Sequence, residues 1–258
     1  MSTPDSATPT IELLGVTKSF GAVDVLRGVN FAARAGEVTA LVGDNGAGKS
    51  TLIKGMAGSQ PYDGGEIRFQ GRPVNLDTPA HASEFGIEVV YQDLALCDNL
   101  DITQNMFLGR EMVDGVLLDN LTMQTRAAAT LDSLGVRTVT SVKQLVASLS
   151  GGQRQTVAIA RSVLWKNNVV ILDEPTAALG VAQTQQVLQL VRELASKGVA
   201  VVLVSHNMQE VLSVADVVHV MYLGQMAAVL DAKVTDIEEV VGHITGKGAI
   251  PVAREGLR

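Results

Sequence analysis

Short apolar runs without polar alternation recur along the chain and predict the strands of a covered sheet. They occupy residues 38–42, 87–90, 169–172 and 199–204. Strands that helices bury on both faces show this pattern, because neither face is left to water. Between the last two runs, apolar residues recur at helical spacing, at Val187, Leu190, Val191 and Leu194. This spacing predicts a crossover helix, so the pattern as a whole predicts an α/β core with a mostly parallel sheet.

Weaker patterns flank this core. Peripheral strands are expected at 11–16, 29–33 and 66–70, with a turn at 71–73 after the last of them, and a hairpin at 217–223 and 226–230. Residues 93–165 contain no comparable strand and carry helical patterns at 122–134 and 152–164. They predict a helical lobe inserted into the α/β core.

Length, composition and charge bound the number of domains and the classes of partner. The 258 residues, 47% of them hydrophobic, suit one domain over 11–230, with a flexible tail at 1–10 and a C-terminal extension at 231–258. The formal charge of −7 argues against nucleic acid as a partner. No apolar run reaches the roughly 20 residues of a membrane span, and residues 1–10 lack the features of a secretory signal. The single Cys97 fits a reducing compartment.

The apolar run at 38–42 leads into a glycine loop and a helix predicted at 51–57, which is the order of a phosphate-binding loop. The glycines let the backbone turn sharply, so that N–H groups and the helix N-terminus face phosphate oxygens. Lys49 would reach the β- and γ-phosphates, and the Ser50 hydroxyl would bind Mg²⁺. The alternative is a glycine-rich turn that fits the pattern by chance. The expected ATP-binding residues are Gly43, Asp44, Asn45, Gly46, Ala47, Gly48, Lys49, Ser50 and Thr51.

A pair of carboxylates ends the apolar run at 169–172. In a parallel sheet this position lies at the carboxyl edge, beside the glycine loop, where α/β proteins bind ligands. Asp173 suits a role at Mg²⁺, either direct or through water, and Glu174 can polarise the attacking water. Taken alone, the pair could equally be a solvated strand end.

The segment Leu149-Ser150-Gly151-Gly152-Gln153 predicts the start of a helix. Ser150 is a good N-cap, and the N–H groups of the first turn attract anions. A capped helix start without a ligand is the simpler alternative for this segment considered by itself.

The glycine loop, the Leu-Ser-Gly-Gly-Gln segment and the acidic strand end, in this order, resemble the nucleotide-binding subunit of an ABC transporter. The likeness extends over about 11–230. It implies a P-loop NTPase core with a peripheral antiparallel β lobe and an inserted helical lobe near 93–165. It also implies ATP hydrolysis with Mg²⁺, in which Lys49 and Glu174 would act as catalytic residues.

Three further residues gain a role from this resemblance. Gln92 resembles the glutamine that senses the γ-phosphate, binds Mg²⁺ and links the core to the helical lobe. His206 resembles the histidine that contacts the γ-phosphate, and Phe20 stands where the family places an aromatic ring against adenine. Without the resemblance, a surface amide, a structural histidine and a packed core aromatic would be the expected readings.

The family's subunits pair head to tail, and this implies a homodimer. Ser150, Gly151, Gly152 and Gln153 of one copy would then contact ATP held by Lys49 of the other. The chain departs from the family after the acidic strand, because residues 177–180 end in Gly180 where an aspartate is common. This departure bears on how the two sites of a dimer communicate rather than on nucleotide binding.

The glycine loop at 43–46, the segment at 149–161 and the departure at 177–180 together resemble bacterial importers of monosaccharides, of the ribose, xylose and fructose type. Among these, the chain resembles the form with a single cassette. The resemblance implies membrane permease subunits, a periplasmic or extracellular sugar-binding protein, and a peripheral position at the cytoplasmic face of the membrane. The permease is expected at residues 99–111, with Phe107 as a contact residue. The alternatives are a soluble ABC-type ATPase that acts on DNA or ribosomes, or a subunit for another solute. The sugar itself cannot be deduced from this chain.

Overall fold

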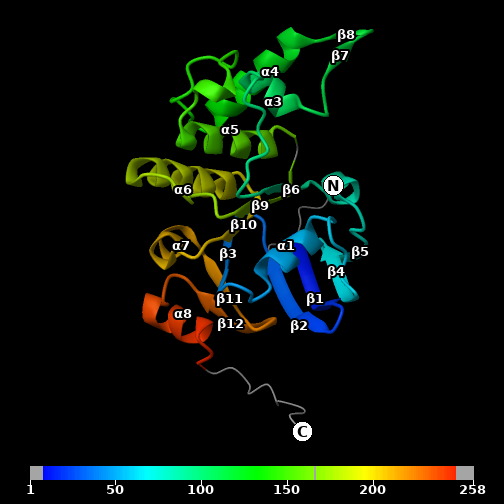
Figure 1. Ribbon diagram of the computed structural model, residues 1–258, viewed down its shortest axis with the longest axis vertical. Helices are drawn as coiled ribbons and strands as arrows, with labels where there is room; N and C mark the ends of the chain where they lie inside the picture. The colour runs from blue at the N-terminus through cyan, green and yellow to red at the C-terminus, as the bar shows by residue number, and fades with distance from the viewer. Residues whose placement is uncertain (1–7, 166, 248–258) are drawn as a thin grey trace.

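The computed structural model describes residues 8–165 and 167–247, and Figure 1 shows an α/β core with a β lobe beside it and a helical lobe above it. The predicted fold class is therefore confirmed. Most of the expected tail at 1–10 and the last part of the extension at 231–258 lie outside the described residues. No helix in the two described stretches is long and apolar enough to cross a membrane.

A six-stranded sheet forms the centre of the molecule. Its order is β12 (Gln225–Asp231), β11 (Val217–Tyr222), β3 (Val38–Gly43), β10 (Ala200–Val204), β9 (Val169–Asp173) and β6 (Ile87–Val90). All neighbours are parallel except β12, which forms the predicted hairpin with β11. Because parallel strands share a direction, the carboxyl ends of β3, β6, β9 and β10 meet at one edge.

The two faces of this sheet bury two separate hydrophobic clusters. Successive residues of β9 alternate between them, since Val170 and Leu172 face one cluster and Val169 and Ile171 the other. The first cluster receives α6 (Val181–Ser196), α7 (Met208–Val214), α8 (Ile237–Ile244) and the helical lobe. The second receives α1 (Lys49–Met56) and the β lobe. Burial on both sides explains why these strands lack polar alternation.

The β lobe is an antiparallel sheet in the order β2 (Val23–Ala33), β1 (Ile11–Phe20), β4 (Gly64–Phe69) and β5 (Arg72–Val74). The turn predicted at 71–73 is wrong in its extent, because Arg72 and Pro73 already pair with β4. Gln70 and Gly71 both have positive φ, at 49° and 76°, so two residues suffice to reverse the chain. The short helix α2 (Pro79–Glu84) then leads into β6.

The helical lobe contains α3 (Ile102–Phe107), α4 (Asn120–Ser133), the 3₁₀ turn η1 (Val146–Ser148) and α5 (Gly151–Val163). The helical patterns at 122–134 and 152–164 thus correspond to α4 and α5. A small hairpin, β7 (Val113–Asp114) and β8 (Leu117–Leu118), was not expected there, because strands of two residues carry no readable periodicity.

Candidate functional site

The predicted catalytic residues meet at the carboxyl edge of the six-stranded sheet. In the parallel ladders, Val204 of β10 lies opposite both Asp173 of β9 and Leu41 of β3. The segments that continue these strands therefore emerge side by side. They carry the glycine loop, the two carboxylates and His206.

The glycine loop has a backbone that other residues could not adopt. Gly43, Gly46 and Gly48 have φ of 154°, 81° and 104°. A Cβ on Gly43 would lie 2.5 Å from the carbonyl oxygen of Met221, and one on Gly48 would lie 2.9 Å from Leu26. The helix α1 starts at Lys49 with no side-chain hydrogen bond at its cap. Its first N–H groups are thus left to an anion, which is the arrangement expected of a phosphate cradle.

Lys49 follows the glycine loop in sequence, and its side chain folds back to contact the backbone of that loop. Its Nζ donates hydrogen bonds to the carbonyl oxygens of Gly43 and Asp44, at 2.8 and 3.0 Å. Burial lowers the pKa of Lys49, while the charges of Glu174, Asp44 and Asp173 act in the opposite direction. The ammonium is therefore held by two carbonyl oxygens of the loop and stands in the field of three carboxylates.

The two carboxylates differ in their surroundings. Burial and the neighbouring Glu174 raise the pKa of Asp173, against the effect of Lys49. The carboxylate of Glu174 lies 2.8 Å from Nδ1 of His206, and these side chains are 17% and 77% exposed. Glu174 has a left-handed backbone with φ of 51°, and its N–H donates to the carbonyl oxygen of Val204 at 2.9 Å. The backbone thus turns Glu174 toward the strand that delivers His206.

Sequence reasoning missed a polar cluster formed by residues that follow this pair in the chain. The hydroxyl of Thr176 donates to the carboxylate of Glu210, which also accepts from Nδ2 of Asn207 at 2.8 Å. Asn207 caps α7 by accepting from the backbone of Gln209 and Glu210. The segment after Glu174 is in this way fastened to the start of α7, directly after His206. The available signal was Asn207 three residues before Glu210 at a helix start.

The start of α5 lies on the helical lobe rather than at the sheet edge. Ser150 forms a full capping box with Gln153, whose Nε2 also donates to the carbonyl oxygen of Thr138 at 2.6 Å. A Cβ on Gly152 would lie 2.9 Å from the side chain of Gln183, so this glycine allows α5 to approach α6 closely. Ser150 and Gly151 are exposed, whereas Gly152 is buried. In the part of the chain that is described, no hydrogen bond or ion pair joins this helix start to the glycine loop.

Gln92 and Phe20 both lie at the surface. Gln92 follows β6 at the same sheet edge and is exposed. Among the described residues, its side chain makes no hydrogen bond. Phe20 ends β1 with 44% of its surface exposed, and Nζ of Lys18 lies 5.7 Å from the centre of its ring. An exposed ring is free to stack on a planar ligand, whereas a core aromatic would not be.

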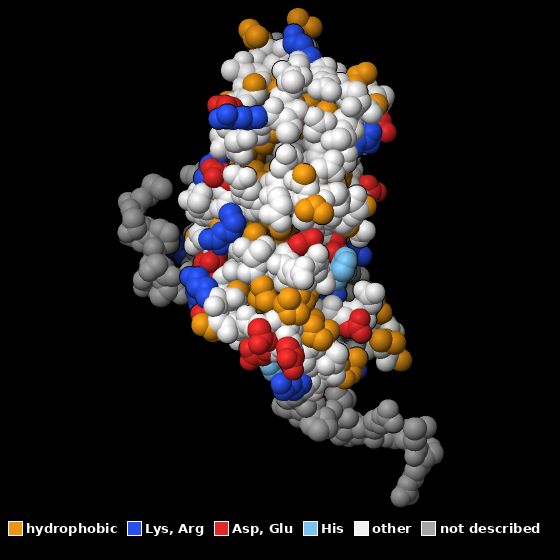
Figure 2. All heavy atoms as spheres, turned by 90° about the vertical axis from the view of Figure 1, so that its left-hand side faces the viewer, with side chains coloured by type: hydrophobic (Ala, Val, Ile, Leu, Met, Phe, Trp, Pro, Cys, Tyr) orange, Lys and Arg blue, Asp and Glu red, His pale blue; other side chains and the backbone are white. Residues whose placement is uncertain are grey.

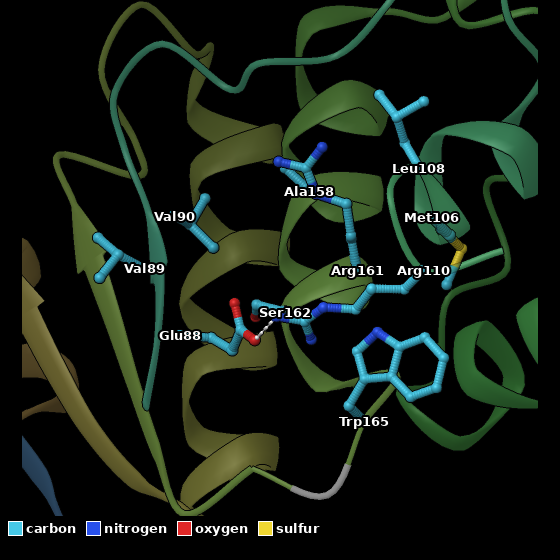
Figure 3. Close-up of a pocket in the computed structure, with 10 residues that line it drawn as sticks. All are labelled: Glu88, Val89, Val90, Met106, Leu108, Arg110, Ala158, Arg161, Ser162 and Trp165. Carbon is cyan, nitrogen blue, oxygen red and sulfur yellow. Dashed lines mark hydrogen bonds and ion pairs between the residues drawn. The ribbon is translucent and has the colours of Figure 1, made fainter. Parts of the chain in front are cut away.

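A groove of about 200 Å³ lies between β6, α5 and the segment after α3 (Figure 3). Its polar lining includes Glu88 and Arg110, which form an ion pair at 2.8 Å, and Arg161. The expectation that Phe107 is a surface contact here is wrong, because this side chain is fully buried and packs edge-on against Trp165. The helix α3 is too short to show a periodicity, so its buried face could not be told from its exposed one. Leu108, which is 48% exposed, lines the groove instead.

Comparison with known proteins connects these features. Residues 26–177 match the family model described as ABC transporter. The chain is 43% identical over 245 residues to the fructose import ATP-binding protein FrcA of Rhizobium meliloti, covering 92% of this chain and 94% of that protein. It is 42% identical over 235 residues to the xylose/arabinose import ATP-binding protein XylG of Sulfolobus acidocaldarius, covering 91% and 93%.

The fold is shared with solved structures as well. The ADP conformation of MJ1267, an ATP-binding cassette of an ABC transporter, is similar with a TM-score of 0.79 at 25% identity. The likeness covers 93% of this chain and 96% of that one.

Proposed function

This chain belongs to the ABC transporter family, and on that premise we propose that it hydrolyses ATP to power the import of a monosaccharide. The observation that carries the proposal is the identity of 43% with a fructose import ATP-binding protein along almost the whole of both chains. The sheet-edge geometry supports the ATPase half of the proposal, and the relatives support the sugar half.

In the proposed site, the glycine loop and the start of α1 hold the phosphates of ATP. Lys49 gives up its bonds to Gly43 and Asp44 for phosphate oxygens, which bear more charge than carbonyls. The exposed hydroxyl of Ser50, the half-buried Asp173 and the amide of Gln92 provide oxygens of the kind that Mg²⁺ prefers. The bound Mg²⁺ would neutralise charge that develops on the transferred phosphoryl group.

Glu174 would accept a proton from the attacking water, and His206 would hold that carboxylate in place. The Glu174–His206 pair supports this assignment, since a base needs a partner that fixes its orientation. The fastening of Thr176 and Asn207 through Glu210 keeps the base and His206 on one rigid unit.

A second copy of the chain is proposed to complete each site. Ser150 and Gly151 are exposed at a helix start that, among the described residues, makes no hydrogen bond or ion pair to the glycine loop of its own chain, which supports their contact with ATP on the other copy. The Glu174→Gln variant should therefore go from monomer to dimer when Mg-ATP is added, as measured by light scattering. A protein that stays monomeric in saturating ATP would contradict the shared site.

Membrane permease subunits are proposed to dock in the groove that Leu108 and Arg110 line, with a sugar-binding protein on the far side of the membrane. The chain would then act as a peripheral subunit at the cytoplasmic face. A soluble ABC-type ATPase acting on nucleic acid is less well supported. On the face in Figure 2, Lys and Arg side chains are scattered among acidic ones rather than gathered into a basic patch.

The deciding experiment is uptake of radiolabelled sugars by cells that lack this chain, complemented with the wild-type chain or with Glu174→Gln. We expect uptake of one pentose or hexose to be lost and to return with the wild-type chain alone. If every monosaccharide enters normally while another solute does not, the sugar assignment is wrong and the transporter ATPase stands. If no solute is affected, transport itself is excluded.

A further inference from the structure

We propose that Arg161 is a positioning residue for Gln92, because its guanidinium holds the backbone of the two residues that begin the loop after Gln92-Asp93. The inference rests on the proposed ATPase function and adds a residue to it. Arg161 lies on α5, 69 positions after Gln92. Nothing in the sequence near Gln92 indicates that such a partner exists.

The contacts are direct. Nη1 of Arg161 donates to the carbonyl oxygen of Ala95 at 3.0 Å, and Nη2 donates to that of Leu94 at 3.1 Å. Burial also lowers the pKa of Arg161. A guanidinium withdrawn from water in this way needs hydrogen-bond acceptors from the protein. Removing it would leave both carbonyl oxygens without these charged donors.

The loop needs this support because its backbone is strained. Ala95 has φ of 48°, in the left-handed region that alanine avoids. Its N–H bonds the side chain of Asp93 at 3.3 Å, a long hydrogen bond in an exposed position. Two charged hydrogen bonds from Arg161 are therefore the strongest contacts that hold the turn.

A second arginine of α5 fastens the next part of the same loop. Nη1 of Arg154 lies 2.7 Å from the carboxylate of Asp98, and Arg154 stands seven positions before Arg161, on the same side of the helix. Asn105 of α3, which is buried, holds the residue before Asp98. Its side chain accepts from the N–H of Cys97 and donates to the carbonyl oxygen of Cys97. From Leu94 to Cys97 and Asp98 the loop is thus tied to α5 and α3, which leaves the end next to Gln92 dependent on Arg161.

The position of Arg161 also gives it access to the groove. Figure 3 shows Arg161 and Arg110 among the residues around the groove, with Glu88 paired to Arg110. The same guanidinium thus lies against the proposed docking groove and against the loop that carries Gln92. Arg161 thus lines the groove, bonds the loop and belongs to the helix that Ser150 caps.

The test is a double-mutant cycle on ATP hydrolysis by the full chain. Arg161→Met should lower kcat about five- to tenfold, with the Kd for ATP changed less than twofold because the glycine loop is untouched. Arg161→Lys, which keeps the charge but not the fork of donors, should lie between wild type and Arg161→Met. In a Gln92→Ala background, Arg161→Met should change kcat less than twofold, since the residue that it positions is gone.

A rescue separates positioning from simple structural damage. Ala95→Gly in the Arg161→Met chain should recover at least half of the lost kcat, because glycine adopts this φ without strain. The matched control is Arg192→Met on α6, which also removes an arginine bound to a carbonyl oxygen, that of Val214 at 3.0 Å. This control should leave kcat within twofold of wild type.

Multiplicative effects of Arg161→Met and Gln92→Ala, or no rescue by Ala95→Gly, would overturn the proposal. Loss of ATP affinity in the folded Arg161→Lys chain would do so too. These outcomes differ from a failure of the proposed function, in which the wild-type chain itself would not hydrolyse ATP.

Discussion

The sheet edge and the loop between Gln92 and α3 are neighbours, yet they are held by opposite means. At the edge, position follows from the backbone: parallel strands in register deliver Gly43, Asp173 and Val204, and the glycines shape the rest. In the loop, position depends on side chains from distant parts of the chain, Arg161, Arg154 and Asn105. From this difference we expect ATP binding to tolerate most single substitutions. The coupling of the site to the helical lobe should depend instead on a few side-chain contacts.

The largest effect is expected where the backbone is most fixed. Lys49→Ala should lower ATP hydrolysis by about 10³-fold or more, because the site loses the cation proposed to face the γ-phosphate. Release of inorganic phosphate measures it. Lys54→Ala, an exposed lysine on the same helix, serves as the control and should stay within twofold of wild type. Substantial activity of Lys49→Ala would mean that backbone N–H groups alone make the site.

The second test asks whether ATP binding and ATP hydrolysis at the sheet edge depend on different residues. Glu174→Gln should cut turnover by about 10²–10⁴-fold and leave the affinity for ATP near that of wild type, since the amide keeps the shape but not the basicity. Equilibrium binding and turnover are measured on the same preparation, with Glu193→Gln on α6 as the control. Turnover at the wild-type rate would remove Glu174 from the role of base.

The third test compares two adjacent residues of the helical lobe. Phe107→Asp should destabilise the chain by about 3–5 kcal/mol, because it places a carboxylate in a cavity left by a fully buried ring. Leu108→Asp should change stability by less than about 0.5 kcal/mol but should reduce sugar uptake at unchanged ATPase. Urea unfolding and uptake are the measurements. Equal loss of stability in both variants would contradict the assignment of Leu108 to a free groove wall.

The smallest expected effect is the pH dependence of stability that comes from His219. This residue lies at the interface between the two sheets, outside both of the regions compared above. His219 is buried beside Phe31 with its ring centre 4.7 Å away, and burial lowers its pKa from 6.5 to about 4. Between pH 6.5 and pH 4, His219 is protonated in the unfolded chain but neutral in the folded chain. Stability should therefore fall by up to about 3 kcal/mol as the pH drops from 6.5 to 4.

Urea unfolding at pH 7.5 and at pH 5 tests this expectation. His219→Leu should remove part of the acid-induced loss, whereas His81→Leu, at an exposed position on α2, should not. An unchanged loss in His219→Leu would show that other groups cause it.

The sheet edge and the loop after Gln92 also differ in how well they can be predicted from the sequence. The apolar runs and the glycine loop predict the sheet edge well, because each depends on residues next to one another. The loop after Gln92 could not be predicted, since Arg161 is in contact with it only after α5 has packed. Gly152 illustrates the same limit: its place in a glycine-rich motif suggested an anion contact, while the structure gives it a packing role against Gln183. Short helices such as α3 and α7 were missed because six or seven residues carry too little periodicity.

The left-handed backbone of Glu174 has an evolutionary consequence. Glutamate in this conformation costs on the order of 1 kcal/mol, which glycine would avoid. A library of variants selected for heat resistance alone would thus tend to discard this glutamate, and its most stable members would lack the proposed catalytic base. The residue persists at position 174 against the preference of its own main chain. Thermal screening of this protein therefore has to be paired with selection for turnover.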